Sequence, residues 1–111
     1  MTHLFKLGFE VEIPDGYEIQ VRSKSGLALK EGLVVLNSPG TVDQNYRGEV
    51  GVILYATLDG SSVLNSSVRK INKGQKIAQI VLCPVTKCEW EKVDELNETT
   101  RGEGGYGSTG V

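Results

Sequence analysis

Hydrophobic residues recur along the chain in short blocks, and turn-forming residues separate these blocks. Hydrophobic and polar positions alternate in Phe9–Ile13 and in Tyr17–Val21, which predicts two half-buried strands joined by a turn at Pro14–Gly16. The remaining blocks predict further strands, namely Leu33–Leu36, Val50–Thr57, Val63–Ile71 and Ile77–Val85. Short strands at regular spacing are typical of a sandwich, a barrel or a jelly roll, so we expect an all-β domain.

Only one short helical segment is expected. In Ser25–Lys30, the hydroxyl of Ser25 is placed to cap a helical turn, and Leu27, Ala28 and Leu29 would supply its packing face. Such a turn adds little to the core, so the strands carry the fold.

The segment Gly40–Glu49 has turn formers at its tip and strand formers on both sides, Val34–Leu36 and Val50–Leu54, which predicts a β-hairpin. Near the tip lie a carboxylate, Asp43, and an aromatic ring, Tyr46. A hairpin of this kind could present both groups to a ligand, with its backbone amides and carbonyls free to bind a small flat group. Taken alone, the two residues are more typical of a polar turn with a strand-edge tyrosine.

The C-terminal part of the chain differs in composition from the strand-forming part. Glu89–Thr100 is acidic and polar, which indicates a connector, and we expect Trp90 to pack against the body of the domain. Arg101–Val111 is rich in glycine and is typical of a flexible tail. The alternative is a lid, because glycine N–H groups, hydroxyls and a forked guanidinium can bind phosphate while Tyr106 covers a base.

Length and charge limit the possible functions. A chain of 111 residues predicts one domain, and a formal net charge of −2 gives no general attraction to nucleic acid. The apolar runs are too short to span a bilayer, and the N-terminus lacks the apolar core of a secretory signal. Cys83, Cys88 and the distant His3 make a poor zinc site. We therefore expect no nucleic-acid or membrane partner and a cytoplasmic protein, or an intracellular one in an infected host if the source is viral.

Four stretches of the chain resemble, in order, the second to fifth motifs of a known family, the trimeric all-β dUTPases (dUTP diphosphatases). They are Arg22–Ala28, Gly40–Glu49, Gly74–Gln79 and Arg101–Gly110. Each motif alone is weak, since glycine-rich tails are common, but their order and spacing together are specific. The resemblance covers the chain from about Gly8 onward.

The resemblance implies an all-β, distorted jelly roll or β-barrel of the β-clip type. It also implies a homotrimer in which residues 1–100 form the domain and residues 101–111 reach a neighbouring subunit to cover the nucleotide. The implied reaction is hydrolysis of dUTP to dUMP and pyrophosphate. Mg²⁺ would be held by the substrate phosphates and water, with no direct protein ligand.

The same resemblance assigns roles to individual residues. Asp43 would be the general base that activates water, and Tyr46 would pack under the deoxyribose and exclude a 2′-hydroxyl. The backbone of the hairpin would bind the edge of uracil, and Tyr106 would cover the base. The implied substrate-binding set is Lys24, Ser25, Gly26, Asn37, Gly40, Val42, Tyr46, Gln79, Arg101, Gly105, Tyr106, Ser108 and Thr109.

The chain departs from the family pattern at several positions. Lys24 stands where arginine is usual and loses the bidentate fork, and Gln75-Lys76 replaces an Asp-Arg pair. Tyr106 replaces a phenylalanine and should still stack. The first motif, an Ala-Gly-x-Asp-Leu-like segment, does not precede Gly8, which is compatible with a natural short form, a truncation or a separately supplied part. Leu4–Leu7 could pair as a substitute edge strand.

Two other functions stay open at this point. A dUTPase-like protein with weak catalysis could bind nucleotide or a partner and act as a regulator, which the missing first motif favours. A related dCTP deaminase is disfavoured, because the Tyr46 hairpin and the arginine-glycine tail resemble the diphosphatases.

Overall fold

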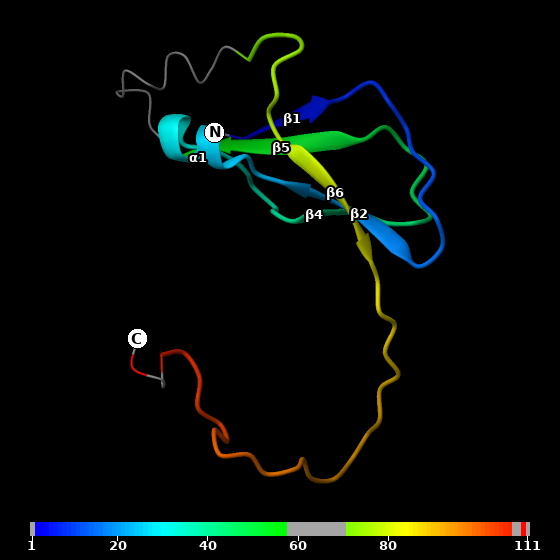
Figure 1. The fold of residues 1–111 in the computed structure, drawn as a ribbon, viewed down its shortest axis with the longest axis vertical. Coiled ribbons are helices and arrows are strands. Elements are labelled where there is room, and N and C mark those ends of the chain that lie inside the picture. Colours follow the sequence, from blue (N-terminus) through cyan, green and yellow to red (C-terminus); the bar gives the residue numbers. More distant parts are fainter. Residues whose placement is uncertain (1, 58–70, 108–109, 111) are drawn as a thin grey trace.

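The computed structural model describes residues 2–57, 71–107 and 110, whose strands form two small antiparallel sheets (Figure 1). One sheet has the order β1-β5-β3 and the other has the order β4-β2-β6. A single two-turn helix, α1, precedes β3. The elements are β1 (Thr2–Lys6), β2 (Tyr17–Arg22), α1 (Ser25–Glu31), β3 (Leu33–Val35), β4 (Gly40–Val42), β5 (Gly51–Ala56) and β6 (Gln79–Pro84). The expected all-β class is confirmed.

The core lies between the two sheets and is built from alternate residues of their strands. Val52 and Leu54 of β5, each 2% exposed, pack with Val35 of β3 and Val21 of β2. Successive side chains of a strand point to opposite faces, so every second residue of β5 enters this core. The alternation that predicted β2 therefore places Val21 on the face that lines this core.

The predicted strand Phe9–Ile13 is wrong. The positive φ of Gly8 (83°) turns the chain as β1 ends, and residues 9–13 belong to no strand. Leu7 donates its N–H to the Val50 carbonyl and Val50 donates to the Phe9 carbonyl, both at 3.0 Å. The first strand lies earlier, at Thr2–Lys6, and pairs with β5, as the possible pairing of Leu4–Leu7 suggested.

The helix forms where it was predicted, but two of its details differ. Its N-cap is Lys24, without a side-chain hydrogen bond, so the predicted capping role of Ser25 is wrong. Leu29 is 85% exposed, because a helix this short turns only part of its surface toward β3. Gly32 ends the helix in the left-handed conformation (φ 65°) and donates to the Ala28 carbonyl at 3.2 Å.

The predicted hairpin is wider than a tight turn. Its flanking strands do pair, with Val35 of β3 opposite Leu54 of β5. Within the connecting segment, however, β4 leaves this sheet and pairs with β2, placing Gly40 opposite Val21. The segment thus joins the two sheets as well as the two strands. The predicted strand Val63–Ile71 lies outside the described residues except for Ile71.

The chain after β6 forms an extended arm that leads away from the two sheets (Figure 1). Trp90 in this arm is 94% exposed, so its predicted packing against the domain is wrong. Charged neighbours on both sides and few apolar residues give the arm little surface to bury. The radius of gyration, 19.2 Å, exceeds the value of about 13 Å expected for a compact chain of this length. None of the helices among the described residues is long and apolar enough to cross a membrane.

Candidate active site

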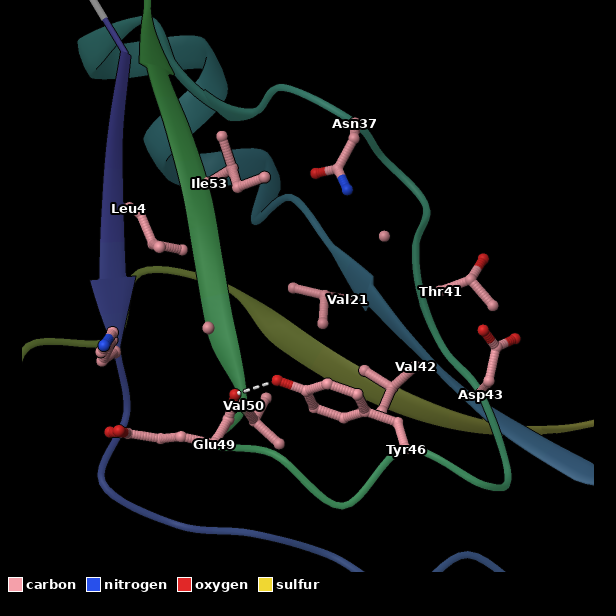
Figure 2. Close-up of a pocket in the computed structure, with 13 residues that line it drawn as sticks. Leu4, Val21, Asn37, Thr41, Val42, Asp43, Tyr46, Glu49, Val50 and Ile53 are labelled. Carbon is pink, nitrogen blue, oxygen red and sulfur yellow. Dashed lines mark hydrogen bonds between the residues drawn. The ribbon is translucent and has the colours of Figure 1, made fainter.

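A cavity of about 380 Å³ opens between the two arms of the β3–β5 connection (Figure 2). Its apolar surface comes from β1, β2 and β5, and its polar groups lie along the connecting segment. The residues that line it are Leu4, Lys6, Val21, Asn37, Gly40, Thr41, Val42, Asp43, Tyr46, Glu49, Val50, Gly51 and Ile53. An apolar hollow with a few polar groups at its margin is a typical small-molecule site.

The ring of Tyr46 extends across the cavity from the arm that carries Asp43 toward the start of β5 (Figure 2). Its hydroxyl donates to the Glu49 carbonyl at 2.8 Å, and its backbone N–H donates to the Asp43 carbonyl at 3.0 Å. The neighbouring Arg47 donates Nη1 to the carbonyls of Gln44 (2.8 Å) and Tyr46 (3.2 Å). These bonds give the turn and the ring a defined orientation.

Asp43 lies exposed just after β4, where the chain turns away from the second sheet. It lines both the hairpin cavity and a second cavity of about 440 Å³ near Asp15 and Lys87. A carboxylate exposed at the edge of a hollow is accessible to water. Asn37, Gly40 and Val42 line the same hollow.

The residues of the second and fourth motifs meet on another part of the protomer. Gln79 donates Nε2 to the Ser23 carbonyl at 2.9 Å, which joins the start of β6 to the segment before α1. Lys24 is half-buried, whereas Ser25 and Gly26 are exposed at the start of the helix. Gln79 also lines a cavity of about 420 Å³ with Arg22, Ser38 and three other residues, Gln20, Ser23 and Pro39. The structure therefore brings Gln79 to the second motif rather than to Asp43.

The described residues of the predicted tail lie on the extended arm and line none of these three cavities. Arg101 donates Nε to the Gly104 carbonyl at 2.6 Å, and Gly104 donates its N–H back to the Arg101 carbonyl at 3.1 Å. Tyr106 is fully exposed and has a positive φ of 52°, and Gly105 is half-buried. Ser108 and Thr109 lie outside the described residues.

Sequence reasoning missed part of the cavity wall. Leu4 and Lys6 reach the cavity because β1 pairs with β5, with Lys6 opposite Gly51. Glu49 belongs to the hairpin motif but was given no role; its Oε2 accepts the Gly8 N–H at 2.8 Å and links the hairpin to the N-terminal segment. Only the apolar pattern of Leu4–Leu7, which suggested pairing, could have pointed to this wall.

Comparisons with known proteins agree with this architecture. The dUTPase family model matches residues 1–110 of the chain. A relative from Anaplasma marginale named deoxyuridine 5'-triphosphate nucleotidohydrolase is 50% identical over 106 residues, which are 96% of this chain and 67% of the relative. A relative of the same name from Desulfotalea psychrophila is 52% identical over 108 residues, covering 97% of this chain and 67% of the relative.

Solved structures of dUTPases share the fold. A mutant dUTPase of Staphylococcus bacteriophage 80alpha, solved with dUpNHpp, has a TM-score of 0.73 at 24% identity and matches 99% of this chain and 81% of its own. The same phage enzyme with dUPNHPP, in another structure, has a TM-score of 0.68 at 23% identity, over 100% and 82% of the two chains. The similarity of sequence over the whole chain, together with this shared fold, shows that the chain belongs to the dUTPase family.

Proposed function

We propose that this protein is a dUTP diphosphatase that hydrolyses dUTP to dUMP and pyrophosphate. The observation that carries the proposal is the hairpin cavity, in which Tyr46 lies across the hollow and Asp43 stands at its edge. The relatives that are about 50% identical to this chain carry the name of this activity.

The hairpin cavity takes the deoxyuridine part of the substrate. Backbone groups of the Asn37, Gly40 and Val42 segment, which lines the cavity, bind the polar edge of uracil, and the residues around the base exclude the methyl group of thymine. Cytosine presents a different donor and acceptor pattern, so binding it would leave buried polar groups unpaired. The ring of Tyr46 packs under the deoxyribose and occupies the space that a 2′-hydroxyl would need.

The phosphates are bound by groups that lie elsewhere in the protomer. Lys24, Ser25, Gly26 and Gln79 supply a cation, a hydroxyl, a backbone N–H and an amide, the usual groups for phosphate binding. Gln79 lines a cavity separate from the hairpin cavity, Ser25 and Gly26 lie at the start of α1, and the described tail residues 101–107 follow an arm that leads away from the two sheets (Figure 1). A homotrimer accounts for both observations, because neighbouring subunits can bring a hairpin, a phosphate-binding segment and a tail together.

Magnesium fits this site as a partner of the substrate. Within the described ranges, no group of three or more His, Cys, Asp or Glu side chains is placed to hold a metal ion. A dUTPase of phage phi11, 22% identical to this chain, has been solved with a structural Mg(II) ion. Mg²⁺ bound to the triphosphate would neutralise charge on the phosphate oxygens, and its ligands would be those oxygens and water.

The reaction then needs positioning and one proton transfer. Asp43 accepts a proton from a water molecule while the water oxygen forms a bond to the α-phosphorus. The bond from the α-phosphorus to the bridging oxygen breaks, and pyrophosphate leaves. Arg101 lies on the tail, which would close over the bound nucleotide so that its guanidinium contacts the terminal phosphate and the ring of Tyr106 covers the uracil.

The test is pyrophosphate release from dUTP in the presence of Mg²⁺, with dTTP, dCTP and UTP as controls. Selective turnover of dUTP is the expected result. Selective binding of dUTP without turnover would overturn the assignment as an enzyme and favour a nucleotide-binding regulator. Equal turnover of all four nucleotides would contradict the assigned base and sugar contacts.

A further inference from the structure

Gly48, in the second arm of the hairpin, lies directly against the ring of Tyr46. A Cβ added to Gly48 would stand 2.6 Å from Tyr46 Cζ and 3.0 Å from Cε1, and closer still to the hydroxyl oxygen. Ordinary contacts between carbon atoms are about 3.5–4.0 Å. The missing side chain of Gly48 therefore creates the space in which the tyrosine ring lies.

The backbone conformation of Gly48 does not itself require glycine. Its φ lies outside the positive range that Gly8, Gly16 and Gly32 adopt. A left-handed turn is the commonest reason for a glycine in a loop, and it does not apply here. The reason for glycine at this position is therefore the close approach of the Tyr46 ring.

Tyr46 is held both at its backbone and at its hydroxyl. The backbone N–H donates to the Asp43 carbonyl, and the side-chain hydroxyl donates to the Glu49 carbonyl. Gly48 lies between these anchors and is half-buried under the ring. A methyl group at position 48 would push the ring off the backbone and separate its hydroxyl from Glu49.

We propose that Gly48 is a positioning residue for substrate discrimination, and that it acts through Tyr46. This inference rests on the proposed function, in which the Tyr46 ring packs under deoxyribose and excludes the 2′-hydroxyl. With the ring seated on Gly48, its face lies at one fixed depth in the cavity. With the ring displaced, the space for a 2′-hydroxyl is no longer closed, and deoxyribose loses its support.

The experiment measures kcat/KM for dUTP and for UTP in wild type, Gly48→Ala, Tyr46→Ala and the double variant Gly48→Ala/Tyr46→Ala. We expect Gly48→Ala to lower the dUTP/UTP selectivity by about 10- to 100-fold, the effect of misplacing a positioning group by about 1 Å. In the Tyr46→Ala background the same substitution should change the selectivity little, because the ring that it displaces is gone. Asn45→Ala, an exposed change in the same turn, serves as the matched control and should leave the selectivity unchanged.

Two results would overturn the inference. One is unchanged selectivity in Gly48→Ala. The other is a loss of selectivity on Gly48→Ala that is as large in the Tyr46→Ala background as in the wild-type background. Gly48 would then act independently of the ring.

Thermal unfolding of the same four proteins keeps the test informative if Gly48→Ala folds poorly. If the clash is with the ring, the double variant should unfold at the same temperature as Tyr46→Ala. A double variant as unstable as Gly48→Ala would contradict the seating of the ring on Gly48. Turnover of dUTP by the wild-type protein tests the proposed function separately. The comparison of unfolding temperatures does not depend on that result.

Discussion

Truncating Val52 to alanine should destabilise the domain far more than the same truncation at Val93. Val52 is 2% exposed at the centre of β5 and packs with Val21 and Val35, whereas Val93 is 48% exposed on the extended arm. The change removes two buried methyl groups at about 0.8 kcal/mol each, or about 1.6 kcal/mol. Incomplete collapse of the surrounding core brings the expected loss to about 2–3 kcal/mol.

The assay is denaturant and thermal unfolding at one fixed protomer concentration, because subunit association adds to the measured stability. For a chain of 111 residues, 1 kcal/mol corresponds to about 4 °C, so Val52→Ala should lower Tm by about 8–12 °C. Val93→Ala should stay within about 0.5 kcal/mol of wild type. Equal losses in the two variants would refute the reasoning, since β5 would then not form the core between the sheets.

Three further predictions concern the site and its surroundings. Asp43→Asn should lower kcat by about 10²- to 10⁴-fold and leave the binding of a non-hydrolysable dUTP analogue intact; wild-type turnover in this variant would remove Asp43 as the base. Deleting residues 101–111 should abolish most turnover and preserve the oligomer in analytical ultracentrifugation, and a monomer after this deletion would make the tail structural. Glu49→Ala removes the acceptor of the Gly8 N–H and should raise hydrogen exchange of that amide, measured by NMR; unchanged exchange would show that Glu49 does not hold the N-terminal segment.

The sequence predicted those strands whose alternation reflects burial on one face. In β2, Tyr17, Ile19 and Val21 alternate with polar residues and Val21 enters the core, so the period of two was visible in the residues. β5 was predicted instead from its block of strand-forming residues, Val50–Thr57. The pattern failed at Phe9–Ile13, because the same alternation also fits an extended segment that lacks a pairing partner. Pairing between segments that are distant in sequence decides which extended segments become strands. The pattern of hydrophobic and polar residues along the chain does not show which segments pair.

The candidate site could be predicted only in part for the same reason. Asp43 and Tyr46 are close in sequence, so a turn was enough to place both at one cavity. Leu4 reaches that cavity through the pairing of β1 with β5, and Gln79 reaches Ser23 through the pairing of β6 with β2. Trp90 shows the opposite error: an aromatic residue suggested packing, but its acidic surroundings gave it no surface to bury.

The loop between β3 and β4 has a consequence for the proposed trimer. Asn37 in this loop lines the hairpin cavity, whereas the next two residues, Ser38 and Pro39, line the cavity that contains Gln79. Gly40 then returns to the hairpin cavity, where an added Cβ would stand 3.2 Å from Asn37 Nδ2 and 3.4 Å from Val21 Cβ. One short loop is thus the common wall of the nucleoside and phosphate sides of a protomer. In a trimer whose sites combine the hairpin of one subunit with the phosphate-binding segment of another, this wall contacts two different active sites.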